Sequence, residues 1–216
     1  MTIRTPKRRP IRAFVTGGAG FIGSHVVARL LAEGHRVTVY DNLSTGRLAA
    51  IQSHQGDDAF TFVRGDLLDT PRLDEAMAGH DVVWHLAANT DIRTGSRATD
   101  LDLKHCVVGT WNVLDAMRRT EVKEILFASS GVVYGDFPGN PLLESDGPLL
   151  PVSLYGAGKL SGEAFVGAYC HLFAMRGWIF RFANIVGGRS NHGVVYDFVQ
   201  KLRRSPDELV YHPFDI

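Results

Sequence analysis

The sequence is poor in cysteine, in net charge and in long apolar runs, and each shortage excludes a class of protein. Its 216 residues include two cysteines, and neither these nor the nine histidines stand at the spacing of a metal site. The formal net charge is zero, whereas proteins that bind nucleic acids or membrane surfaces usually carry a basic excess. No stretch approaches the roughly 18 apolar residues of a membrane span. We therefore predict a protein of the reducing cytoplasm, with no metal, no nucleic-acid partner and no place in a membrane.

Apolar strands alternate with helical patterns along most of the chain. Continuous apolar strands are typical of a parallel sheet that is covered on both faces. The expected fold class is therefore α/β, a Rossmann-like doubly wound parallel sheet over residues 11–190, preceded by a basic tail at residues 1–10. The expected strands are residues 12–16, 37–40, 60–63, 82–87, 125–129 and 178–182, and the expected helices are residues 21–33, 70–78, 98–119, 153–176 and 194–204.

A glycine-rich turn joins the first strand to the first helix. Gly17, Gly20 and Gly23 allow a tight turn, a close approach to a pyrophosphate and close packing of the helix, which begins with Phe21 and Ile22. The free N–H groups and the positive dipole end of the helix attract phosphates. This context predicts a dinucleotide site.

Asp41 ends the second strand, where a carboxylate accepts hydrogen bonds from the ribose hydroxyls of the adenosine. The same carboxylate repels a 2′-phosphate. NAD is therefore the expected cofactor, in preference to NADP.

Tyr155 and Lys159 open the second long helix, and residues four apart lie on one helix face. A phenol has a pKa of about 10, which is too high for a base at neutral pH. A neighbouring ammonium, together with a positively charged nicotinamide, favours the phenolate and should lower that pKa. The pair is therefore a candidate catalytic base.

These motifs together resemble one family. The chain is similar to the extended short-chain dehydrogenase/reductases, the NAD-dependent nucleotide-sugar epimerases and dehydratases, and most closely to the UDP-glucose (UDP-galactose) 4-epimerases. The resemblance runs from residue 11 to about residue 205. The segments that carry it are residues 16–24, 40–46, 65–67, 85–88, 129–135 and 181–187, together with Tyr155 and Lys159.

The resemblance implies further site residues by position. Ser130 matches the catalytic Ser/Thr that hydrogen-bonds the reacting sugar hydroxyl, and Asn184 matches an asparagine that contacts the diphosphate of the sugar nucleotide. His85 ends a buried strand, and we expect it to be structural. The residues implied to hold the adenosine half are Asp41, Asn42, Asp66 and Leu67, and those implied to line the nicotinamide side are Leu86, Ala87 and Ala88.

The chain departs from the family pattern in two places. Cys106 stands where the family usually has asparagine, which predicts the loss of a polar contact near the nicotinamide and Tyr155. Family members also continue well beyond residue 216. We therefore expect residues 191–216 to be a remnant of the substrate lobe and most of that lobe to be absent.

The resemblance also bears on the reaction. Dehydratases of the family carry Asp-Glu directly after the catalytic Ser/Thr, whereas this chain has Gly131 and Val132, which cannot move a proton. This difference favours 4-epimerisation of a UDP-sugar by transient oxidation at C4. Two alternatives stay open: an NAD-dependent alcohol or carbonyl oxidoreductase that acts on small substrates, and an NAD-binding protein without turnover.

The helices expected at residues 98–119 and 153–176 carry large apolar residues on more than one face. One face should pack on the sheet, and the others need cover. Relatives in the family dimerise through these helices. We therefore expect a homodimer.

Overall fold

The computed structural model describes residues 9–89, 98–136, 141–190 and 193–206. They divide into two compact units, the first ending at Arg181 and the second beginning at Phe182. Among the described residues, no helix is both long and apolar enough to cross a membrane.

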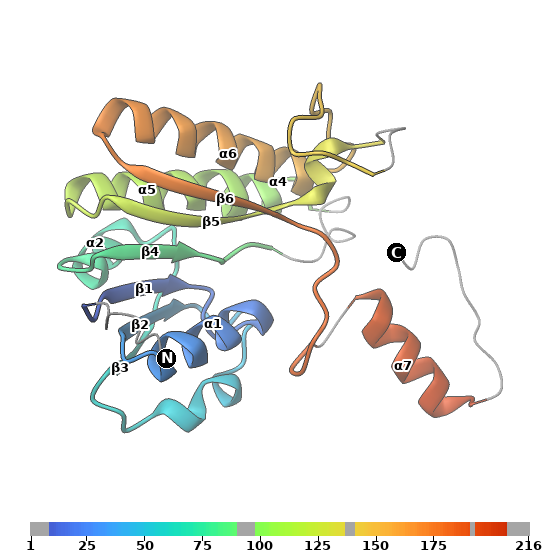
Figure 1. Cartoon of the computed structure of the whole chain (residues 1–216), viewed down its shortest axis with the longest axis horizontal. Helices are drawn as coiled ribbons and strands as arrows, with labels where there is room; N and C mark the ends of the chain where they lie inside the picture. The colour runs from blue at the N-terminus through green and yellow to red at the C-terminus, as the bar shows by residue number, and fades with distance from the viewer. Residues whose placement is uncertain (1–8, 90–97, 137–140, 191–192, 207–216) are drawn as a thin grey trace, which may run out of the picture. The chain divides into compact units, whose positions relative to one another are not determined.

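One parallel sheet organises the first unit (Figure 1). The strand order is β3-β2-β1-β4-β5-β6, which is the Rossmann order expected from the sequence. In the register of the central strands, Val15 lies beside Val39 on one side and Trp84 on the other. The strands are β1 (Arg12–Thr16), β2 (Arg36–Asp41), β3 (Phe60–Arg64), β4 (Val82–His85), β5 (Glu124–Ser130) and β6 (Arg176–Phe182).

Helices lie on both faces of the sheet. The face that carries Phe14, Val83 and Phe127 packs in one core with α2, α5 and α6, while the face that carries Val15 and Val39 packs with α1 (Figure 1). Side chains alternate between the faces of a strand, so each strand feeds both cores. The helices of the first unit are α1 (Phe21–Ala32), α2 (Thr70–Met77), α4 (Asp100–Asp102), the π-helical segment η3 (Leu103–Val108), α5 (Gly109–Arg119) and α6 (Leu154–Phe173), with short 3₁₀ turns η1 (Leu48–Ala50), η2 (Gln52–His54) and η4 (Gly131–Tyr134). The second unit contains α7 (Val194–Arg204).

Three expected elements differ from the structure. The helix expected at residues 98–119 is interrupted by the π-helical segment η3. The helix expected at residues 153–176 ends at Phe173, because Ala174 adopts a left-handed conformation with φ 50°, and β6 begins at Arg176. The strand expected at residues 82–87 ends at His85, and the chain continues without strand structure.

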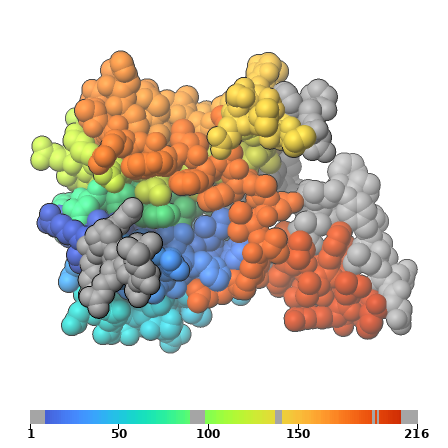
Figure 2. All heavy atoms as spheres, in the orientation of Figure 1, coloured from blue at the N-terminus to red at the C-terminus, as the bar shows by residue number. Residues whose placement is uncertain are grey.

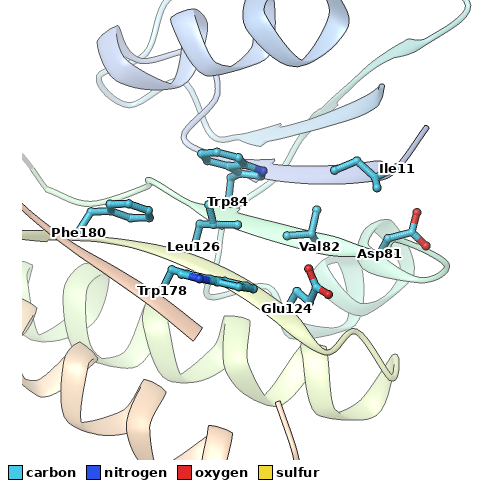
Figure 3. A pocket seen from close by; sticks show the side chains of 8 residues that line it. All are labelled: Ile11, Asp81, Val82, Trp84, Glu124, Leu126, Trp178 and Phe180. Atoms are coloured by element: carbon cyan, nitrogen blue, oxygen red, sulfur yellow. The ribbon is translucent and has the colours of Figure 1, made fainter. Parts of the chain in front are cut away.

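The face shared with α1 contains an open apolar cavity of about 290 Å³ beside β1, β4, β5 and β6 (Figure 3). Asp81, Val82 and Glu124 lie at the amino-terminal ends of their strands, so the cavity lies away from the carboxyl edge where α/β proteins bind nucleotides. We therefore do not assign the active site to this cavity. It is lined by Ile11, Asp81, Val82, Trp84, Glu124, Leu126, Trp178 and Phe180.

The first prediction tests the close packing of α6 on β5. Gly162→Ala should lower the free energy of unfolding by about 1–3 kcal/mol, because the added Cβ would lie 2.5 Å from Phe127 Cζ. Gly167→Ala on the same helix is the matched control. Nothing lies within 4 Å of its added Cβ, so helix propensity should raise the free energy of unfolding by about 0.5–1 kcal/mol. Urea unfolding followed by circular dichroism measures both changes, and equal effects would contradict the packing.

Candidate functional site

The glycine-rich turn is shaped to hold an anion. Gly17 has φ +68°, and a Cβ added there would lie 2.7 Å from the backbone nitrogen of Ala87. A Cβ added at Gly23 would clash with the Gly17 carbonyl oxygen. Helix α1 begins at Phe21, directly after Gly20, and no side chain caps it. The first N–H groups of Phe21 and Ile22 therefore face the turn at the positive end of the helix, an arrangement that fits a pyrophosphate.

Asp41 fastens this turn to the end of β2. Asp41 is 7% exposed, and its carboxylate accepts hydrogen bonds from the N–H of Ala19 at 2.9 Å and of Leu43 at 2.8 Å. Burial raises the pKa of Asp41, while the two backbone bonds lower it. A carboxylate has about four acceptor positions, so two bonds leave capacity for ribose hydroxyls. Asp41 therefore lies at the end of β2, as the sequence predicted. It also holds the backbone of the glycine-rich turn, which the sequence did not predict.

The other adenosine-side residues lie together at the carboxyl ends of β2 and β3. Asn42 Nδ2 donates to Asp66 Oδ2 at 2.9 Å, and the Leu68 N–H donates to Asp66 Oδ1 at 2.9 Å. Burial alone would raise the pKa of Asp66, but these two bonds lower it below its usual value. Leu67 is buried, and its carbonyl accepts from Asn112 Nδ2 at 2.8 Å. The four residues implied by resemblance therefore share one edge of the sheet.

The segment after β4 is held against the glycine-rich turn. Thr16 Oγ1 accepts from the N–H groups of Leu86 at 3.2 Å and Ala87 at 3.3 Å, and Ala88 follows directly. His85 is fully buried between Thr16 Oγ1 at 2.7 Å and Thr110 Oγ1 at 3.0 Å. Burial, and then Lys159, lower the pKa of His85 to about 3. His85 is therefore a neutral residue that joins two strands to α5, as expected for a structural histidine.

The end of β5 and the first turns of α6 bring the three candidate catalytic residues together. The side chains of Ser130 and Tyr155 interact, which affects the pKa of Tyr155. Lys159 lies one turn further along α6 and is 3% exposed. Its Nζ lies 5.8 Å from the centre of the Tyr155 ring and donates to the Ala128 carbonyl at 2.6 Å.

Burial dominates the electrostatics of this group. Burial, the nearby Cys106 and Asp102 raise the pKa of Tyr155 to about 12, although the interaction with Ser130 lowers it. Burial lowers the pKa of Lys159 to about 8, with Cys106 acting in the opposite direction. The expected lowering of the Tyr155 pKa by Lys159 together with a positively charged nicotinamide stays a prediction.

Cys106 replaces the usual asparagine without leaving its surroundings apolar. The thiol is 3% exposed, lies 3.9 Å from Asp102 Oδ1 as a donor, and accepts from the backbone N–H of Asn89. Asn89 Nδ2 also donates to Asp102 Oδ1 at 3.0 Å. A Cβ added at Gly158 would lie 2.7 Å from Cys106 Cβ, so α6 meets the π-helical segment here. The thiol thus has two polar neighbours, Asp102 and Asn89, and the expected loss of a polar contact near the nicotinamide and Tyr155 stays a prediction.

The remaining site residues lie outside this group. Gly131 and Val132 form the start of η4, directly after Ser130. Asn184 belongs to the second unit, so its contact with a diphosphate stays a prediction. Two buried carboxylates were missed by sequence reasoning: Asp102, for which the sequence gives no signal, and Glu163, whose spacing of four after Lys159 could have indicated it. The described residues contain no group of three or more His, Cys, Asp or Glu side chains that could hold a metal ion.

Comparison with known proteins finds both epimerases and a dehydratase. The chain is 39% identical over 188 residues to UDP-glucose 4-epimerase of Mycolicibacterium smegmatis, covering 85% of this chain and 59% of that protein. It is 34% identical over 210 residues to dTDP-glucose 4,6-dehydratase of Actinoplanes sp., covering 93% of this chain and 65% of that protein. The chain therefore spans about three fifths of the length of these relatives.

Structural comparison agrees with the sequence. The crystal structure of Thermus thermophilus UDP-glucose 4-epimerase in complex with NAD is similar with a TM-score of 0.77 and 34% identity, covering 84% of this chain and 58% of that one. Residues 13–213 match the family described as NAD dependent epimerase/dehydratase. Since this match extends from β1 to beyond α7, the protein belongs to the NAD dependent epimerase/dehydratase family.

Proposed function

We propose that this chain binds NAD and catalyses 4-epimerisation of a UDP-sugar of the UDP-glucose/UDP-galactose type. The observation that carries the proposal is the grouping of Ser130, Tyr155 and Lys159 where β5 meets α6, with Gly131 and Val132 directly after Ser130. An elimination of water needs an acid and a base at those two positions, whereas an epimerisation at C4 does not. The names of the similar epimerases support the same reaction.

The residues have separate tasks in this reaction. Bound NAD supplies the acceptor and donor of the hydride at C4. Tyr155 takes the proton of the 4-hydroxyl and later returns it, and Ser130 orients that hydroxyl through its own hydrogen bond. Because burial raises the pKa of Tyr155, the charge of Lys159 and the positive charge of the oxidised nicotinamide must both favour the phenolate. The turn at residues 17–23 would hold the phosphates of NAD, and its adenosine would be held by Asp41, Asn42, Asp66 and Leu67. Residues 86–88 would line the nicotinamide side. Asn184 would contact the diphosphate of the sugar nucleotide.

We also propose that the chain forms a homodimer through its two long helical segments, η3 with α5 and α6. Leu103 of η3, Trp111 of α5 and Leu172 of α6 are 56%, 43% and 68% exposed. Large apolar side chains at this exposure favour cover by a second copy of the same surface.

The second prediction concerns Tyr155. Tyr155→Phe should reduce kcat on UDP-galactose by about 10²-fold or more, because the phenyl ring cannot accept a proton. NAD affinity should stay unchanged, since the proposed adenosine contacts lie at the other strands. Steady-state kinetics on UDP-galactose and on a panel of short alcohols, with calorimetry of NAD binding, measures both effects.

Tyr169→Phe is the matched control, because Tyr169 lies on the same helix and away from Ser130. It should leave kcat unchanged. Undiminished turnover in Tyr155→Phe would remove the mechanism. Turnover of alcohols without turnover of UDP-galactose would replace the epimerase with the oxidoreductase.

The third prediction concerns the buried ammonium. The pKa of Lys159 is about 8 in the folded chain against an ordinary 10.5, so holding the proton costs folding free energy below pH 8, and this cost disappears as the pH rises to 10.5. Lys159→Met should therefore raise the free energy of unfolding at pH 7. Removal of the buried charge should add up to about 3 kcal/mol, and loss of the hydrogen bond to Ala128 should subtract about 1 kcal/mol. The gain should shrink by pH 10.

Urea unfolding of the chain without added nucleotide at pH 7 and pH 10 measures this difference. Lys104→Met is the control, because Lys104 is exposed and its replacement should give no such dependence on pH. A Lys159→Met variant that is destabilised equally at both pH values would contradict the burial of a charged lysine. The same variant should lose turnover and shift the pH optimum upward, because the phenolate loses a stabilising charge.

The fourth prediction concerns Asp41. The wild-type chain should bind NAD more tightly than NADP, by about tenfold or more, because the buried carboxylate repels a 2′-phosphate. Asp41→Asn should narrow this preference, and the exposed Asp57→Asn should leave it unchanged. Calorimetry with NAD and with NADP measures both affinities. Equal affinities in the wild type would contradict the assignment of Asp41 to the adenosine ribose.

A further inference from the structure

Helix α6 presents a row of three side chains to the end of β5. Tyr155, Lys159 and Glu163 stand four residues apart and therefore lie on one helix face. Each contacts one of three successive residues of the strand. Tyr155 interacts with the Ser130 side chain, Lys159 donates to the Ala128 carbonyl, and Glu163 Oε1 accepts from Ser129 Oγ at 2.5 Å.

Glu163 is itself held by Arg181 of β6. Arg181 Nη2 donates to Glu163 Oε2 at 2.8 Å and Nε donates to Oε1 at 3.0 Å, a bidentate pair in which Glu163 is buried. Arg181 Nη1 also donates to the Tyr134 hydroxyl at 2.8 Å and to the Glu144 carbonyl at 3.1 Å. The guanidinium thus joins α6 to η4 and to the β5–α6 connection, the yellow region in Figure 2.

We propose that Glu163, fixed by Arg181, is a positioning residue that holds the end of β5 through Ser129, so that Ser130 stays within hydrogen-bond reach of Tyr155. Its effect on turnover rests on the proposed epimerase function, whereas its effect on the Ser130–Tyr155 interaction does not.

A general principle and an observation both indicate that the Glu163–Arg181 pair positions Ser130 rather than only stabilising the fold. A buried ion pair adds little net stability compared with apolar residues of similar size, because desolvation opposes the attraction. The oxygens of Glu163 reach the residue directly before Ser130, and Arg181 reaches Tyr134 at the end of the 3₁₀ turn directly after it. The catalytic serine is therefore fixed from both sides in the sequence. The bonds to Glu163, and then to Tyr134, raise the pKa of Arg181, so the guanidinium stays charged at every working pH.

The chain offers a matched ion pair for control. Arg119 makes a bidentate contact with Asp74, at 2.7 Å and 2.8 Å, and joins α5 to α2 in the same way. Its ion-pair partners are Asp74 of α2 and Asp115 of α5, and neither belongs to β5 or to the proposed site. Arg119→Met therefore removes an arginine from a comparable pair without disturbing the row on α6.

The test reads the interaction between Ser130 and Tyr155 directly. In the full chain labelled with ¹³Cζ-tyrosine, the resonance of Tyr155 is identified among the six tyrosines by Tyr155→Phe, and Ser130→Ala marks its position without that interaction. Ser129→Ala, Glu163→Gln and Arg181→Met should each move the resonance toward the Ser130→Ala position, and Arg119→Met should not. Ser129→Ala keeps the ion pair, so it stays informative if the other two variants fail to fold.

Kinetics on UDP-galactose complete the test. Ser129→Ala should lower kcat by about tenfold with KM changed less than about threefold, because misplacement of an orienting group acts on the chemical step. A Tyr155 resonance unchanged in Ser129→Ala and Glu163→Gln would overturn the proposal, and so would a fall in kcat without a shift of that resonance. If the wild type turns over no UDP-sugar, the proposed function fails, and the resonance alone decides on Glu163.

Discussion

The close approach of α6 to the sheet is the constraint on which the candidate site depends. Glycine makes it possible: a Cβ at Gly162 would lie 2.5 Å from Phe127, and one at Gly158 would lie 2.7 Å from Cys106 Cβ. Because of this distance, side chains of α6 reach the backbone of β5 directly, as Lys159 does at Ala128. If α6 lay further from the sheet by the size of one methyl group, Lys159 would not reach the Ala128 carbonyl and Tyr155 would not reach Ser130.

The same packing sets the energetics of the site. It buries an ammonium, a phenol and two carboxylates within a few turns of one another, where desolvation shifts pKa values by more than one unit. Such a site is stable because the rest of the sheet supports it, in particular the neutral His85 that links Thr16 to Thr110. The protein thus accepts unfavourable burial where chemistry is proposed and compensates for it in the core.

Sequence reasoning identified what short-range patterns determine. The sheet, the glycine-rich turn, Asp41 and the spacing of Tyr155 and Lys159 follow from periodicity and local turn chemistry. It failed where the outcome depends on tertiary contacts. Ala174 gives no sign of a left-handed helix end, and the sequence does not show that Tyr155 is buried beside Cys106, which raises its pKa.

Strand β6 has a consequence for the behaviour of the chain in solution. It forms one edge of the sheet among the described residues, and Trp178, Ile179 and Phe180 are 40–45% exposed in succession. An edge strand that carries exposed apolar side chains on both faces is a template for pairing with another strand. The first unit therefore carries an aggregation hazard at β6, and lysine introduced there would act as a gatekeeper against fibre-like association.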